Sequence, residues 1–322
     1  MSQRSTSDLA NPQGRRHRER NTSRVVEGER RPGADIAEGE AVAPRTYAGD
    51  AFRRFRRTPG ATAGAAIILA ILIGGIFAPI IGGHDPLAQD LGIGSIPPNP
   101  DHLFGTDKLG RDVFARILFG ARVSIAIGFV SVGVAITLGT AIGLVAGYFR
   151  GALDNVLMAA MDMMLAFPSI ILAIAITTIL GPSITNLMIA LGIVYVPQYA
   201  RLARSSTLAV AQLEFVEAAR ALGVSTMRML GRHLLPNIAA PLLVQATLGI
   251  ATAELEAAGL SYLGLGARPP APEWGAMLND ARDYWISAPW ALIFPGVAIT
   301  VLVLGFNLLG DGLRDALDPA DR

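Results

Sequence analysis

The sequence predicts an all-α polytopic membrane protein with six transmembrane helices. Of its 322 residues, 52% are hydrophobic and only 16% are charged, whereas a water-soluble domain carries about a quarter charged residues. The chain also contains six apolar stretches close to the roughly 20 residues that a helix needs to cross the hydrocarbon core. Because a backbone N–H or C=O group without a hydrogen-bond partner is too costly in lipid, such continuous apolar stretches are expected to be helices.

Residues 1–50 are predicted to form a disordered, Arg-rich cytoplasmic tail ahead of a six-helix transmembrane domain at 51–322. The tail is rich in Arg, Gly, Pro, Glu and Ser, a composition that cannot bury a core. It lacks interleaved aromatic residues, so we do not expect it to bind nucleic acid. No apolar signal sequence lies near the start, and the first span is therefore expected to act as its own insertion signal.

Charged residues, glycine and proline separate the predicted spans. The first two spans contain no charge, and Gly181-Pro182-Ser183 divides the uncharged run after Asp162 into the third and fourth spans. In the second span, four glycines are expected to allow close helix packing, namely Gly128, Gly133, Gly139 and Gly143. The six spans are expected at residues 61–81, 123–148, 155–180, 184–199, 236–253 and 289–309.

The distribution of Lys and Arg predicts that both termini are cytoplasmic. With that orientation, the cytoplasmic segments 1–60, 149–154, 200–235 and 310–322 carry 21 of the 27 basic residues, as the positive-inside rule requires. Four of the external basic residues precede the second span, and we expect an amphipathic segment at the outer interface there. These are Lys108, Arg111, Arg116 and Arg122.

The longer cytoplasmic connection, residues 201–235, joins the fourth and fifth spans. We expect one helix from Arg201 to Leu222, since it can form an apolar stripe, and a break at Gly223, which can adopt the left-handed conformation that closes a helix. A second short helix is expected at 225–234, and Pro236 is expected to begin the fifth span. These features describe either an angled helical pair that contacts a partner or an ordinary connecting loop with a glycine break.

Three motifs in this chain resemble a known transporter family. Glu217-Ala218-Ala219, Gly223 and Leu235-Pro236 stand at the spacing of the EAA loop of the membrane subunits of binding-protein-dependent ABC importers. Residues 105–112, GTDKLGRD, and 306–319, FNLLGDGLRDALDP, resemble the peptide and nickel branch, and specifically the dipeptide/oligopeptide permease C subfamily. One departure is His233, where the EAA pattern favours Ile. The resemblance covers about residues 53–319 and excludes the tail.

The resemblance implies the ABC type I importer transmembrane fold and a permease domain that works in a complex. A second, homologous permease subunit would pair with this chain in the cytoplasmic (inner) membrane, and two ATPase subunits would bind ATP and Mg²⁺. An external substrate-binding protein would deliver the substrate, and no cofactor is expected in this chain. Coupling to the ATPases is assigned to the EAA residues, which are Glu217, Ala218, Ala219, Arg220, Gly223, Leu235 and Pro236.

Other functions are disfavoured by the residues present. The only lysine is Lys108, preceded by Asp107, so a Walker A motif cannot form and the chain has no ATP site of its own. Residues 259–263 come close to the GxSxG nucleophile-elbow motif of hydrolases but lack its second glycine. No catalytic residue is therefore predicted. With no cysteine and only four scattered histidines, we predict no metal site. A secondary carrier would keep charges inside its spans, but Asp162, Glu254 and Glu256 are interpreted as interface positions.

The pathway and the docking surface are assigned from polar residues. Four polar positions in the spans are candidates to line the pathway, with interhelical hydrogen bonding as the alternative: Thr177, Gln198, Gln245 and Asn307. The external loop 257–288 is rich in proline, aromatic and charged residues, which suits docking of a binding protein. The candidates there are Trp274, Asp280, Arg282 and Asp283.

The cargo within this branch is predicted to be short peptides, with nickel or a nickel chelate as the alternative. Nickel favours imidazole ligands, and only His84 and His102 are expected outside, with no histidine inside a span. Polar uncharged residues and the Met-rich third span suit a peptide backbone with variable side chains.

Overall fold

The computed structural model describes residues 55–56 and 58–317, which belong to one compact unit, Thr46–Arg322. The predicted tail at 1–50 lies outside the described residues. Every regular element among the described residues is a helix, apart from a single bridge between Thr106 and Asp112, so the prediction of an all-α fold is confirmed.

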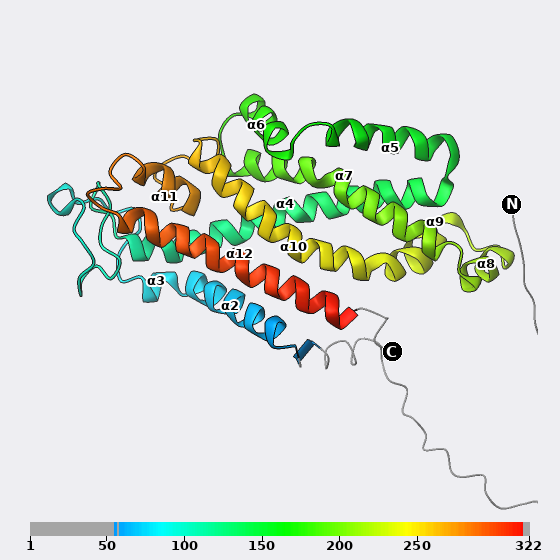
Figure 1. The fold of residues 1–322 in the computed structure, drawn as a ribbon, viewed down its shortest axis with the longest axis horizontal. Coiled ribbons are helices and arrows are strands. Elements are labelled where there is room, and N and C mark those ends of the chain that lie inside the picture. Colours follow the sequence, from blue (N-terminus) through cyan, green and yellow to red (C-terminus); the bar gives the residue numbers. More distant parts are fainter. Residues whose placement is uncertain (1–54, 57, 318–322) are drawn as a thin grey trace, which may run out of the picture. The chain divides into compact units, whose positions relative to one another are not determined.

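The helices follow one another with short connections, except for residues 82–112 before α4, 263–273 before α11 and 282–289 before α12 (Figure 1). A 3₁₀ turn at Leu91–Ile93 lies in the first loop, and a π-helical turn at Met229–Leu234 leads into α10. The helices are α2 (Pro59–Ile76), α3 (Ala78–Ile81), α4 (Val113–Phe149), α5 (Gly151–Leu165), α6 (Ser169–Leu180), α7 (Ile184–Val210), α8 (Glu214–Ala221), α9 (Thr226–Arg228), α10 (Leu235–Tyr262), α11 (Trp274–Ala281) and α12 (Trp290–Leu317).

Four helical segments are long and apolar enough to cross a membrane by length and composition: α2, α4, Thr226–Tyr262 and α12. A fifth span is reached if the bent pair α5 and α6 is counted as one. Adding the 27-residue helix α7 would make up the six predicted spans, but α7 does not meet the same test. Its polar residues include Asn186, Gln198, Arg201 and Arg204.

The third predicted span is not a straight helix. We expected residues 155–180 to be continuous, but α5 ends at Leu165, α6 begins at Ser169, and the two are bent by 89°. Pro168 precedes α6 with a φ of −54°. Proline cannot donate the backbone hydrogen bond that a continuous helix needs there, and it disfavours a helical conformation in the residue before it, so Pro168 was the sequence signal that the prediction missed.

The second predicted span begins ten residues earlier than expected, at Val113. The side chain of Asp112 caps α4 by accepting a hydrogen bond from the backbone N–H of Ala115 at 2.6 Å. With 37 residues, α4 is about 55 Å long and exceeds the roughly 30 Å hydrocarbon core. The helix therefore extends beyond the hydrocarbon core.

Of the four basic residues expected in an interfacial segment before the second span, Lys108 and Arg122 are exposed, whereas the structure buries the other two. Arg111 and Arg116 are each 1% exposed. Arg111 pairs through Nε with Asp107 at 2.5 Å and through Nη2 with Asp280 at 3.0 Å. Arg116 donates to the carbonyls of Pro86 and Pro270. Acidic groups and carbonyls from several loops thus compensate the positive charge in a buried polar cluster at this end of the bundle.

Helix α4 packs most extensively against α7. A Cβ added to Gly143 would lie 2.2 Å from the Ala200 carbonyl oxygen, and one added to Gly139 would lie 2.6 Å from Tyr199 Cβ. Close packing at these two glycines is therefore confirmed. Close packing also holds at Gly128, where a Cβ would lie 2.7 Å from Ile250 Cγ2 of α10. A Cβ at Gly133 would have no neighbour within 4 Å, so Gly133 is not a packing position in this chain.

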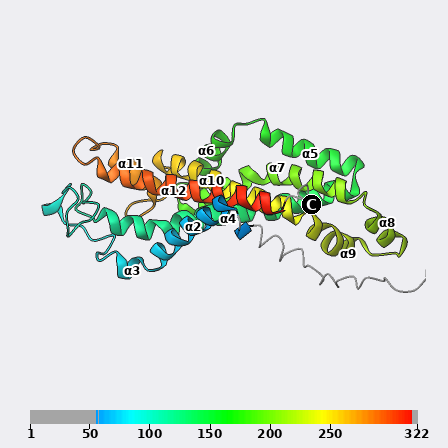
Figure 2. The ribbon, with the colours of Figure 1, turned by 60° about the horizontal axis from the view of Figure 1, so that its bottom comes forward.

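The arrangement places the predicted cytoplasmic and external features at opposite ends of the bundle. In Figures 1 and 2, α8 and α9 lie at one end, and α3 and α11 lie at the other. Helix α12 runs between α2 and α10 and contacts both.

The side chain of Glu273 caps α11 by accepting hydrogen bonds from the backbone N–H groups of Gly275 and Ala276. Burial of this side chain raises the pKa of its carboxyl group.

Candidate functional site

The segment between α7 and α10 forms an angled set of short helices. We expected one helix from Arg201 to Leu222, but α7 ends at Val210 and a turn at residues 211–213 separates it from α8. Backbone N–H groups at the end of this turn bond back by three residues, from Gln212 to Ala209 and from Leu213 to Val210. The sequence therefore forms three helical pieces here instead of two.

Gly223 ends α8, as predicted. Its φ is +72°, its N–H donates to the Arg220 carbonyl at 2.9 Å, and the N–H of Val224 donates to the Ala219 carbonyl at 3.2 Å. This pair of bonds is a Schellman motif, in which the residue after the helix adopts the left-handed conformation that glycine tolerates best. The chain direction after α8 is thus set locally.

Within α8 the predicted coupling residues face both the protein and the solvent. Val216 is fully buried and Ala219 is 7% exposed, whereas Glu217 and Ala218 are exposed. Arg220 lies over the ring of Tyr148, with its guanidinium carbon 5.4 Å from the ring centroid, which ties α8 to the end of α4. Among the described residues, the Glu217 side chain has no hydrogen-bond or ion-pair partner, so its carboxylate is free to contact another chain.

Exposed apolar side chains lie on or next to α8, the helix that carries Glu217, and on α9. These side chains, which we call the coupling surface, are 41% to 85% exposed: Leu213, Phe215, Leu222 and Met227. The predicted apolar stripe on one long helix does not form, because the turn at 211–213 and the break at Gly223 redirect its members. Exposed large apolar side chains beside charged ones are typical of an interaction site.

The exit of this segment differs from the prediction. Residues 226–234 are helical and Leu235 and Pro236 stand at the start of α10, as predicted, but the π turn at Met229–Leu234 leads into α10 without a break. Residues 226–262 therefore act as one 37-residue helix. A movement of α9 would be passed directly to α10, since no flexible joint separates them.

The predicted docking residues of the outer loop divide into buried and exposed pairs. Trp274 is 1% exposed and its indole N–H donates to the Ile117 carbonyl, so it cannot form an external docking surface in this fold. Asp280 is 22% exposed and pairs with Arg111. Arg282 and Asp283 remain exposed and pair with each other at 3.3 Å.

The predicted pathway residues are not gathered into one lining. Thr177 is fully buried and its hydroxyl donates to the Ala173 carbonyl, so it packs within α6 and does not line a passage. Gln198 and Asn307 are exposed, and Gln245 is half-buried. These three lie on α7, α12 and α10, respectively.

Charged groups of the spans are mostly paired or buried. Asp154 and Arg204 form a two-pronged ion pair with distances of 2.5 and 2.6 Å, and Asp162 pairs with Arg201 at 2.5 Å. Glu254 is 1% exposed and its carboxylate oxygens have no hydrogen-bond partner among the described residues. Glu254 therefore faces the bundle interior, and its assignment to the membrane interface stays a prediction.

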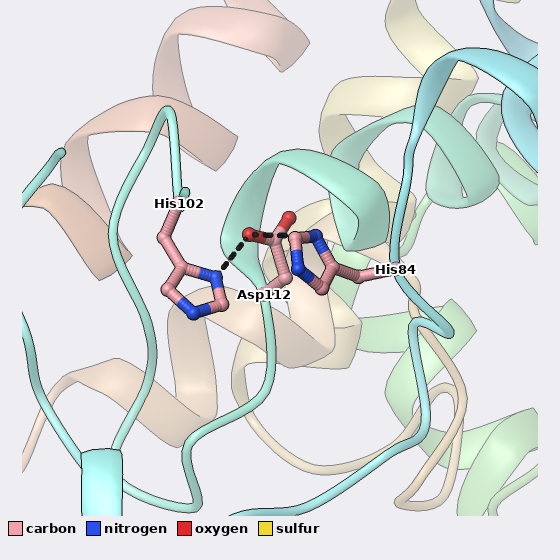
Figure 3. Close-up of side chains that lie close together, drawn as sticks. All are labelled: His84, His102 and Asp112. Atoms are coloured by element: carbon pink, nitrogen blue, oxygen red, sulfur yellow. Dashed lines mark hydrogen bonds and ion pairs between the residues drawn. The ribbon is translucent and has the colours of Figure 1, made fainter. Parts of the chain in front are cut away.

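Two histidines of the loop between α3 and α4 lie close together, contrary to the expectation of scattered histidines. His84 and His102 both turn Nδ1 toward Oδ2 of Asp112, at 3.8 and 2.8 Å (Figure 3). Their ring centroids are 4.8 Å apart. The ligand atoms of the three residues all lie within 4.8 Å of one another, close enough to hold a metal ion. No spacing motif signals this cluster, because loop folding brings it together.

Comparison with known proteins gives two family matches. Residues 139–322 match the family described as binding-protein-dependent transport system inner membrane component. Residues 46–98 match the N-terminal TM domain of oligopeptide transport permease C.

Relatives of known name are similar over most of the chain. The dipeptide transport system permease protein DppC of Alkalihalophilus pseudofirmus is 48% identical over 270 residues, covering 84% of this chain and 89% of that protein. The DppC of Haemophilus influenzae is 41% identical, covering 86% of this chain and 96% of that protein. The glutathione transport system permease protein GsiD of Escherichia coli O6:K15:H31 is 46% identical, covering 83% and 89%.

Among solved structures, the fold is similar to a chain of the inward-facing MetNI methionine ABC transporter. The TM-score is 0.51 at 21% sequence identity, covering 62% of this chain and 94% of that chain. At this identity the likeness concerns the fold alone.

Proposed function

Because this chain belongs to the family of binding-protein-dependent transport system inner membrane components, we propose that it translocates short peptides as one of two permease subunits of an ATP-driven importer. Membership makes it a multi-pass inner membrane transport subunit and not an enzyme. The family works with an ATPase, which hydrolyses ATP, and with a binding protein.

The proposal that the cargo is a peptide is supported by relatives at 41% to 48% identity over more than four fifths of the chain. They are named for dipeptide and glutathione transport, and each of these cargoes is a small peptide. Nickel or a nickel chelate is the alternative cargo. The cluster of His84, His102 and Asp112 adds no support to nickel as the cargo. The two histidines lie in the loop before α4 and Asp112 is the N-cap of α4, so none of the three lies within a span.

Coupling to the ATPase is proposed to occur at the coupling surface. Glu217 is exposed and unpartnered among the described residues, and large apolar side chains lie on or next to the same helix, so it suits insertion against a second protein. Ala218, Ala219 and Arg220 form the rest of α8, with Arg220 bracing it against Tyr148. Gly223 sets the angle, and Leu235-Pro236 begin the helix that carries the motion into the membrane.

The remaining assignments follow from this one. A second, homologous permease would complete the pathway, with Gln198, Gln245 and Asn307 as candidates to line it. Both termini and residues 201–235 would be cytoplasmic, which puts the outer loops on the side of the binding protein. There Arg282 and Asp283 are the exposed candidates for docking, since Trp274 is buried.

Growth on peptides tests the cargo. Deleting the gene for this chain in an amino-acid auxotroph should abolish growth on a dipeptide that contains the missing residue, while growth on the free amino acid is preserved. A plasmid copy of the wild-type chain should restore growth. Unchanged growth on several di- and oligopeptides, together with loss of a nickel-enzyme activity that excess nickel restores, would overturn the peptide proposal in favour of nickel.

A further inference from the structure

We propose that His84, His102 and Asp112 form a binding site for a divalent transition-metal ion of the zinc type, which holds the outer loops onto the start of α4 (Figure 3). This site is separate from the transport of peptides. It would join the two ends of the loop between α3 and α4, at His84 and His102, to the capping residue of α4.

The donor set and its spacing suit such an ion. Two imidazoles and one carboxylate are ligands that zinc accepts, at bond lengths of about 2.0–2.2 Å, which place tetrahedral ligands about 3.4 Å apart. The Nδ1 atoms of His84 and His102 lie 3.8 and 2.8 Å from Asp112 Oδ2. Shifts of about 1 Å or less in the side chains would therefore bring the set to a coordinating geometry, with the His102–Asp112 hydrogen bond replaced by two bonds to the ion.

The charge of Asp112 also calls for a cation. Its side chain is 3% exposed, and among the described residues no Lys or Arg lies within ion-pair distance of it. The neighbouring Arg111 is already committed to Asp107 and Asp280. A buried carboxylate without a full positive partner is costly, and the backbone N–H of Ala115 satisfies only Oδ1. Oδ2 is contacted by Nδ1 of the two histidines alone among the described side chains.

The three ligands combine a fixed part with an accessible part. Asp112 is held by its capping bond, and the backbone N–H of His102 donates to Asn99 Oδ1 at 3.0 Å. The side chain of His84 is 46% exposed and borders a groove lined also by Gly83, Phe119 and Pro272. An ion could enter from this side, and water could occupy the fourth coordination position.

The alternative is that His102 and Asp112 only brace the loop through their hydrogen bond. A hydrogen-bonded brace and a metal site differ in whether the protein binds a metal ion. A brace needs no ion and tolerates a chelator, whereas a metal site binds one equivalent and loses it when a ligand is replaced.

Metal titration of the purified importer complex distinguishes them. After removal of any affinity tag and dialysis against EDTA, Zn²⁺ binding should show one tight equivalent per copy of this chain that the ligand variants lack. His102→Gln and Asp112→Asn should weaken this equivalent at least about tenfold. Asp112→Asn keeps an oxygen that can cap α4, so folding is preserved. His233→Gln, which changes a histidine outside the cluster, is the matched control and should bind as the wild type does.

A second measurement reports on the loops directly. Zn²⁺ should slow backbone hydrogen exchange in residues 83–103 of the wild-type chain and of His233→Gln, but not of His102→Gln. Equal Zn²⁺ binding by the wild type and His102→Gln, or a wild type that binds no tight equivalent of added Zn²⁺, would overturn the proposal. Neither measurement depends on the cargo, so a failure of the peptide proposal would leave this test unaffected.

Discussion

Replacing Gly223 tests whether the end of α8 sets the coupling geometry. An added Cβ at Gly223 would meet no atom within 4 Å, so any cost arises from the backbone alone. The φ of +72° lies in the left-handed region, where a residue with a Cβ costs about 1–2 kcal/mol and β-branched residues are least tolerated. A penalty of that size changes the ratio of two conformations by a factor of about 5–30.

The expected order of activity follows from this conformational cost. Gly223→Asn should remain close to the wild type, because Asn adopts the left-handed conformation readily. Gly223→Ala should lose part of the activity, and Gly223→Val should lose most of it, because the Schellman bonds of residues 223 and 224 would open. Gly231→Val is the matched control, since Gly231 also has no neighbour within 4 Å but has no positive φ.

The assay is peptide-stimulated ATP hydrolysis and peptide uptake by the complex reconstituted in lipid vesicles. Both activities should fall together across the Gly223 series, while insertion of the chain into the membrane is unchanged. Wild-type activity of Gly223→Val would refute the reasoning, as would a Gly223→Asn variant that is as impaired as the Val variant.

Two further predictions concern packing and orientation. Gly143→Ala should lower the thermal unfolding temperature of the purified protein, because its Cβ would lie 2.2 Å from the Ala200 carbonyl oxygen and overpacking costs about 1–3 kcal/mol. Gly133→Ala, whose Cβ would have no neighbour within 4 Å, should leave the unfolding temperature unchanged. Equal effects of the two substitutions would contradict the packing described. In this cysteine-free chain, Ser225→Cys should be labelled by an impermeant thiol reagent only from the cytoplasmic side and Asp283→Cys only from the outside, and labelling of both from one side would reject the proposed orientation.

Features that depend on composition and local conformation could be predicted from the sequence. The apolar stretches specify membrane helices wherever they fold, because lipid leaves the backbone no other hydrogen-bond partner. The Gly181-Pro182-Ser183 turn and the break at Gly223 were also predictable, because residues in the left-handed region are usually glycine. The bend at Pro168 had the same kind of local signal.

Features that depend on contacts between distant segments were not predictable in this way. Trp274 looks like a surface aromatic in the sequence, yet Ile117 accepts its indole hydrogen bond across 157 residues. The basic residues at the start of α4 suggest an interface, yet Asp280 of α11 neutralises Arg111 from 169 residues away. Neither Ile117 nor Asp280 lies near its partner in the sequence, so a local sequence pattern cannot reveal these two contacts.

The sequence by itself therefore determined the membrane class, the helical fold, the family resemblance and the position of the glycine that ends α8. Only the tertiary structure decided that Trp274 is buried, that Glu217 remains exposed on a helix with exposed apolar side chains, and that His84 and His102 meet at Asp112. The physical reason is that backbone preference and hydrophobicity are properties of nearby residues, whereas burial and charge pairing depend on which loops and helices the whole fold brings together.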